Sequence, residues 1–137
     1  MFLLALILGF TTGCGSKDLK TVTVSGKVTV DGEPIETGAI LFTPIDGKTA
    51  TGGGAIINGA YKAEVPPGAK FKVLVTGGKF AGKEPLYEGV PDSPTRDKVV
   101  SVTPVDYNNK NTTNLEADIQ GKTENLDFDL SSKYKKG

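Results

Sequence analysis

Histidine and tryptophan are absent from the 137-residue sequence, and cysteine occurs once, at Cys14. Zinc sites usually need histidine or cysteine ligands, and nucleophilic triads need histidine or a similar base, so neither can be assembled in a familiar form. A single cysteine also excludes an intramolecular disulfide. The sequence therefore predicts no metal site, no cofactor and no enzymatic activity, although carboxylate chemistry and oxygen-ligated cations stay open.

The chain also lacks a net charge. Sixteen Lys and Arg residues balance sixteen Asp and Glu residues, so no overall field draws the protein onto nucleic acid or an anionic membrane. We therefore expect no nucleic-acid partner. The length and the 37% hydrophobic content suit one globular domain, with too little sequence for a second core of ordinary size.

The longest apolar run lies at the N-terminus, where residues 2–10 read FLLALILGF. This run is about half the roughly 20 apolar residues that a membrane-spanning helix needs, and the small and polar residues 11–13 follow it. The pattern predicts a cleaved signal peptide over residues 1–13. The sequence Thr11-Thr12-Gly13-Cys14 resembles the bacterial lipobox, and this resemblance implies lipidation of Cys14.

A lipidated Cys14 would carry several acyl chains, which together hold a protein stably on a membrane. Residues 14–20 would then form a short linker between the lipid and the folded domain. We expect a protein of the cell envelope, tethered at the outer membrane or the periplasmic face, whose first partner is the membrane itself. An ordinary secretory signal and a buried N-terminal strand are the alternatives.

Residues 21–131 read as short strands separated by turn residues. Apolar and polar residues alternate over 21–30, 39–43, 60–65, 70–76, 115–119 and 126–130, with weaker strand signals over 49–57 and 99–103. Asp31-Gly32 and Asn58-Gly59 are tight-turn dipeptides. The pattern predicts one all-β domain, a Greek-key-like sandwich of seven or eight strands with Phe71 and Phe128 in its core, and a disordered polar tail over 132–137.

Several motifs resemble the carboxypeptidase regulatory-like, or transthyretin-like, β-sandwich of small bacterial lipoproteins. They are the hairpin Val24–Pro34, the strand Ala39–Pro44, the pair Gly59-Ala60-Tyr61 and Val65–Val73, and the closing strand Asn125–Leu130. Their order covers most of the chain after the leader. The usual Asp before the Gly-x-Tyr motif is missing here, since residues 55–58 read AIIN. The resemblance implies a non-catalytic envelope domain.

The segment Gly77 to Asp97 is rich in Gly, Lys and Pro, and it reads as a long loop. Long loops on a rigid sandwich often carry recognition, so this segment is the candidate contact surface, and its alternative is a solvated excursion. The candidate contact residues are Lys79, Phe80, Lys83, Tyr87 and Arg96. The first seven positions of a P-loop also match here, but Glu84 and Pro85 oppose the Mg²⁺ ligand and the helix that a nucleotide site needs.

Two further features concern the end of the chain. Asp127 and Asp129 are expected on one outer face beside Asp118 or Glu116, where a cation could bridge them or where they simply keep a sheet edge soluble. Tyr107 is expected to be a corner residue whose hydroxyl bonds to the backbone.

The predicted function is a tethered binding or structural module with a protein or glycan partner. The alternatives are an accessory domain of a larger envelope assembly and a carbohydrate-active enzyme.

Overall fold

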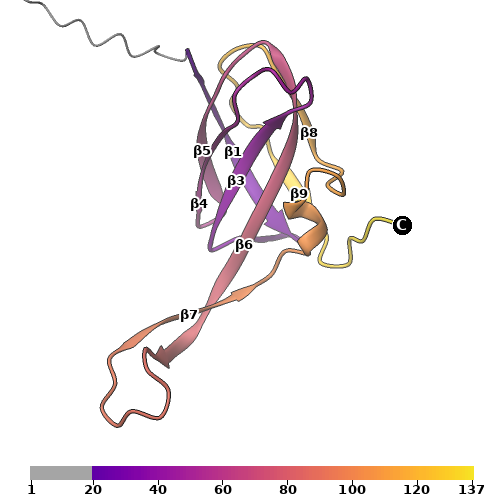
Figure 1. Cartoon of the computed structure of the whole chain (residues 1–137). Helices are drawn as coiled ribbons and strands as arrows, with labels where there is room; N and C mark the ends of the chain where they lie inside the picture. The colour runs from indigo at the N-terminus through magenta and orange to yellow at the C-terminus, as the bar shows by residue number, and fades with distance from the viewer. Residues whose placement is uncertain (1–19) are drawn as a thin grey trace, which may run out of the picture.

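A computed structural model describes residues 20–137, and in this range the chain is all-β with no α-helix (Figure 1). The elements are β1 (Val22–Val30), β2 (Glu33–Pro34), β3 (Thr37–Pro44), β4 (Gly52–Ile57), β5 (Ala60–Val65), β6 (Ala69–Pro85), β7 (Thr95–Ser101), the 3-10 helix η1 (Val105–Asn108), β8 (Glu116–Ile119) and β9 (Phe128–Leu130). Among the described residues, no helix has the length and apolarity to cross a membrane.

The strands form one curled, mainly antiparallel sheet in the order β2-β1-β5-β4-β3-β6-β7. Two further strands attach beside this path, since β8 pairs with β6 and β9 pairs in parallel with β1. The sheet curls because β1 and β6 each change neighbours along their length. Residues 22–27 of β1 pair with β5 and residues 28–30 with β9, while β6 pairs first with β8 and then with β7.

The core lies inside the curl and follows the alternation expected from the sequence. Fully buried side chains come from every second position of β1, β3 and β6, as period-two patterning requires; they include Val24, Val28, Ile40, Phe42, Phe71, Val73 and Val75. Phe42 lies between Tyr61 and Phe71, with ring centroids 6.4 Å and 6.3 Å away. The expected core position of Phe71 is confirmed, and Phe128 is buried as well.

Both tight turns occur where the dipeptides predict them. Asp31-Gly32 and Asn58-Gly59 have positive φ at both residues, as two-residue hairpin turns of type I′ need. Gly26 in the middle of β1 permits a close approach of another segment. A Cβ atom built there would lie 2.0 Å from the carbonyl oxygen of Leu126, so any side chain would collide with the segment that leads into β9.

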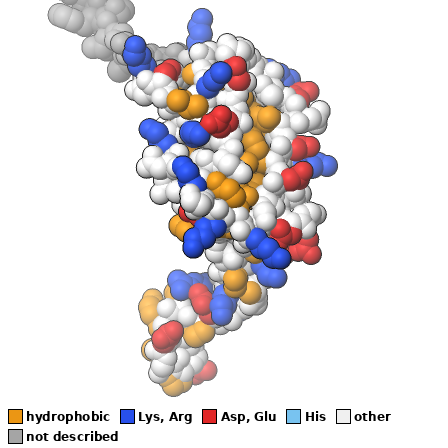
Figure 2. All heavy atoms as spheres, turned by 90° about the vertical axis from the view of Figure 1, so that its right-hand side faces the viewer, with side chains coloured by type: hydrophobic (Ala, Val, Ile, Leu, Met, Phe, Trp, Pro, Cys, Tyr) orange, Lys and Arg blue, Asp and Glu red, His pale blue; other side chains and the backbone are white. Residues whose placement is uncertain are grey.

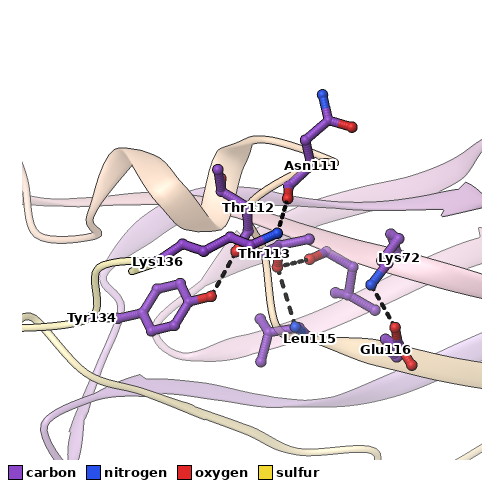
Figure 3. A network of polar contacts seen from close by, with 9 residues as sticks. Lys72, Asn111, Thr112, Thr113, Leu115, Glu116, Tyr134 and Lys136 are labelled. Carbon is purple, nitrogen blue, oxygen red and sulfur yellow. Dashed lines mark hydrogen bonds and ion pairs between the residues drawn. The ribbon is translucent and has the colours of Figure 1, made fainter.

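The C-terminal residues, expected to be disordered, pack on the domain. The ring of Tyr134 stacks on Tyr107 with centroids 4.5 Å apart, and its hydroxyl donates to the backbone oxygen of Thr112 at 2.6 Å (Figure 3). Lys136 Nζ donates to the backbone oxygen of Asn111. The prediction failed because it weighed only the polarity of residues 132–137 and not the one aromatic ring among them.

Tyr107 behaves as predicted for a corner residue. Its ring is buried, and its hydroxyl accepts a hydrogen bond from the backbone N–H of Ser131 at 3.0 Å. A second tyrosine makes a similar bond, since the Tyr61 hydroxyl donates to the backbone oxygen of Leu126 at 2.6 Å. Burial raises the pKa of Tyr61, which keeps this donor protonated. The two bonds hold the backbone on either side of β9, at Leu126 and Ser131.

Candidate functional site

The segment predicted as a loop is instead a protruding hairpin, which we call the arm and define as residues 79–100. Strand β6 continues to Pro85 and pairs with β7, so only residues 86–94 form a loop at the tip (Figure 1). The loop prediction was wrong because it required inward and outward alternation, whereas strands outside the core need none. Strand β7 also starts at Thr95, four residues before the predicted 99–103 segment.

The arm brings together all five predicted contact residues. Lys79, Phe80 and Lys83 lie on β6, Tyr87 follows in the tip, and Arg96 lies on β7. The strand register shifts between Phe80 and Lys83. Such a bulge bends the ribbon and separates the side chains at its base from those near its tip.

Two of these residues are engaged across the ribbon. Lys83 Nζ lies 2.9 Å from Asp97 Oδ1, and Arg96 Nε lies 2.8 Å from Glu84 Oε1. Three of the four side chains are largely exposed and Glu84 is about one-third exposed, so each ion pair contributes roughly 1 kcal/mol at most. The pairs hold the two strands in register, and they neutralise four of the charges on the arm.

Exposed hydrophobic side chains are concentrated on the arm. Large hydrophobic residues that face solvent on the arm are Phe80, Leu86, Tyr87, Val90, Val99 and Val100; Figure 2 shows hydrophobic side chains on the protruding hairpin. A two-stranded ribbon without further neighbours is marginally stable in water, and clustered exposed apolar groups are typical of interaction surfaces. The arm is therefore the candidate functional site.

The base of the arm is fixed to the body. Residues of β6 beyond Gly78 have no partner in β3, and the first free amide, that of Phe80, donates to Glu36 Oε2 at 2.8 Å. A cavity of about 520 Å³ lies beside this bond, between the turn after β1, the start of the arm and Ser132. Three acidic residues, Asp31, Glu33 and Glu36, are among those that line it.

Two of those three carboxylates already serve the fold. Glu36 accepts from the Phe80 amide, and Asp31 accepts from the hydroxyl and the backbone N–H of Ser132. The Ser132 hydroxyl, followed by its N–H, lowers the pKa of Asp31 below the usual range. A general acid needs a raised pKa, so Asp31 has the opposite property.

The expected grouping of Asp127 and Asp129 with Asp118 or Glu116 does not occur. Strand β9 pairs with β1, not with β8. Asp127 therefore accepts from the backbone N–H of Lys27 at 2.8 Å, and Asp129 accepts from the Thr29 hydroxyl at 2.6 Å. Over residues 20–137, no cluster of acidic or other ligating side chains could hold a metal ion.

Sequence reasoning missed a second surface, on the outer side of the sheet. Outward positions of β4, β3 and β6 form three rows without a charged residue: Ile57, Thr37 and Gly78; Ala55, Ala39 and Thr76; Gly53, Leu41 and Leu74. We call these positions the uncharged face. The sequence does contain an indication of this face. The outward positions of β6 change from charged residues, Lys70 and Lys72, to uncharged ones, Leu74 and Thr76.

Charged side chains border the uncharged face on both sides. Lys62 and Glu64 occupy the outward positions of β5, and Lys72 pairs with Glu116 at the edge toward β8 (Figure 3). This Lys72 contact lowers the pKa of Glu116. The lack of charge is therefore confined to the middle of the sheet.

Cys14, the predicted lipidation site, lies outside the described residues. Comparison of the chain with protein-family models, curated proteins and solved structures found no significant match.

Proposed function

We propose that this protein is a lipoprotein of the cell envelope, tethered through Cys14, whose non-catalytic domain binds a protein or glycan partner with the arm. The observation that carries the binding role is the concentration of exposed hydrophobic side chains on a ribbon beside which no other strand of residues 20–137 lies. A hairpin with such faces gains stability when a partner covers them.

The positions of the two functional parts support this proposal. Strand β1 begins at the end of the body opposite the arm (Figure 1), and its other end, at Val30, lies beside the arm base with Gly78 and Lys79. Nine extended residues span about 30 Å. A lipid at Cys14 would therefore hold one end of the body at the membrane, and the arm would point away from it.

We also propose that the curled sheet is the sandwich of the carboxypeptidase regulatory-like family. The Gly59-Ala60-Tyr61 and Val65–Val73 motifs support this assignment, because the first places Tyr61 in the core and the second leads into the central strand β6. The family is non-catalytic, which agrees with the sequence's lack of histidine and with the structural use of Asp31 and Glu36.

The tether is tested by expressing the full chain and Cys14→Ser in a bacterial host and separating membranes from soluble material. We expect the wild type in the membrane fraction and Cys14→Ser in the soluble fraction, because removing the thiol removes the acylation site. A wild-type chain that is already soluble, or a Cys14→Ser chain that stays on membranes, would contradict the tether.

The arm is tested with the full chain as bait against envelope extracts and a glycan array. Phe80→Ser combined with Tyr87→Ser should abolish the capture of any partner that the wild type retains, because it removes two exposed aromatic anchors. Ile45→Ser, an exposed hydrophobic position away from the arm, is the matched control and should keep binding. Equal binding by all three chains would show that the arm is not the contact.

A further inference from the structure

The uncharged face carries a projecting side chain and a hollow. Ile57 projects from β4 with 65% of its surface exposed. On the other side of β3, a hollow of about 460 Å³ lies over Gly38, Gly77 and Gly78, with Thr76 and Val99 among its walls. Of these glycines, Gly78 is the one at an outward position, where a side chain would point toward the Val99 wall. Among the described residues, no charged side chain lines the hollow.

The projection and the hollow lie at the same level of the sheet. Thr37 on the middle strand β3 is the register partner of both Ile57 and Gly78. A two-fold axis that runs along β3 exchanges the two sides of this strand. Such an axis therefore places Ile57 of one copy over the hollow of the other copy, and the same contact forms twice, as an isologous interface requires.

We propose that two copies of this chain associate face to face about this axis. Sheets that pack in this way keep their strands nearly aligned and lie about 10 Å apart. The three uncharged rows allow close approach without opposing like charges, and the charged residues Lys62, Glu64 and Lys72 stay at the rim. A polar rim around an apolar centre is the usual anatomy of a protein interface.

The area agrees with a dimer of moderate affinity. Leu41, Ile57, Phe80 and Val99 expose between 42% and 65% of their surfaces, and Phe80 and Val99 extend the face onto the base of the arm. Together with the small residues between them, they offer on the order of 500 Å² per copy, near the lower end of specific interfaces. Confinement to a membrane would raise the local concentration and favour the dimer further.

The axis direction is also compatible with the proposed tether, although the dimer does not depend on it. Rotation about an axis along β3 keeps the strand direction. In one copy, β1 begins at the end of the body opposite the arm (Figure 1). Both β1 starts would therefore lie at one end of the dimer and both arms at the other. Two lipids could then enter the same membrane while two arms project away from it.

Sedimentation velocity of the full chain, extracted from membranes in a density-matched detergent, tests this proposal. The wild type should sediment as a dimer at about 100 μM, within the range expected of small interfaces. Ile57→Glu should sediment as a monomer, because two carboxylates would enter the apolar contact. Thr76→Lys should also sediment as a monomer, because the lysine side chain would fill the hollow. The strand already carries lysine at the outward positions 70 and 72, so a lysine at position 76 suits the fold.

Val105→Glu is the matched control, because Val105 is a 79% exposed aliphatic residue outside the face, and it should remain dimeric. Circular dichroism spectra that match the wild type establish that each variant is folded. A monomeric wild type, or a dimer that persists in both Ile57→Glu and Thr76→Lys, overturns the proposal. A chain that is soluble without detergent, because Cys14 carries no lipid, would contradict the tether. The same sedimentation experiment in buffer would then still test whether the chain forms the dimer.

Discussion

The two phenylalanines of β6 provide an internal comparison of core and arm. Phe71 has no exposed surface and meets Phe42 edge to face at 6.3 Å, whereas Phe80 on the same strand is 53% exposed. Phe71→Ala removes a ring from a packed core and leaves a cavity, which costs about 3 to 5 kcal/mol. Phe80→Ala removes a ring from a surface without core contacts, so its cost in the monomer, measured at a concentration too low for the proposed dimer, should be within about 0.5 kcal/mol.

Urea unfolding followed by tyrosine fluorescence measures both changes, since the chain has no tryptophan. For a domain of this size, about 1 kcal/mol corresponds to roughly 4 °C in melting temperature. Phe71→Ala should therefore melt on the order of 10 to 20 °C lower, while Phe80→Ala should stay near the wild type. Equal losses for the two variants would refute the division of β6 into a core half and an arm half.

Two further predictions concern the closing segment and the tail. Gly26→Ala should destabilise the domain by at least about 1 kcal/mol in the same urea assay, because its Cβ would lie 2.0 Å from the Leu126 oxygen; an unchanged midpoint would show that the segment is not packed there. Hydrogen bonds from Ser132 lower the folded pKa of Asp31 below the ordinary 3.8, so the tail contact should be complete above pH 3.8 and lost as the pH falls through the folded pKa. An NMR titration of the Ser132 amide measures this, and a midpoint at or above 3.8 would contradict it.

The core and the turns could be predicted from the sequence because each depends on local chemistry. Alternating valines in β1 can bury one face only in an extended chain. Asp31-Gly32 and Asn58-Gly59 have the residue types that tolerate positive φ. The hydroxyl bond of Tyr107 was also predictable, because a buried tyrosine hydroxyl needs a partner.

The partners of the strands could not be predicted in the same way. The alternation of Leu126, Phe128 and Leu130 shows which side faces the core, but it does not show that β9 lies parallel to β1. This pairing moved Asp127 and Asp129 away from β8 and removed the candidate cation site. The uncharged face was missed for the same reason, because Ile57, Thr37 and Gly78 are neighbours only through the sheet register.

Two adjacent glycines of β6, Gly77 and Gly78, lie at the boundary between the core and the arm. A Cβ at Gly77 would lie 2.6 Å from the Ile35 side chain, and a Cβ at Gly78 would lie 2.5 Å from Val99. Before this point every second side chain of β6 is buried, and after it the residues up to Pro85 are mainly exposed. Because the strand continues through these glycines, the packed half sets the direction in which the arm leaves the body, and the bulge between Phe80 and Lys83 then bends it. The arm's orientation is thus a consequence of core packing, although its own surface contributes little to folding and is free to serve binding.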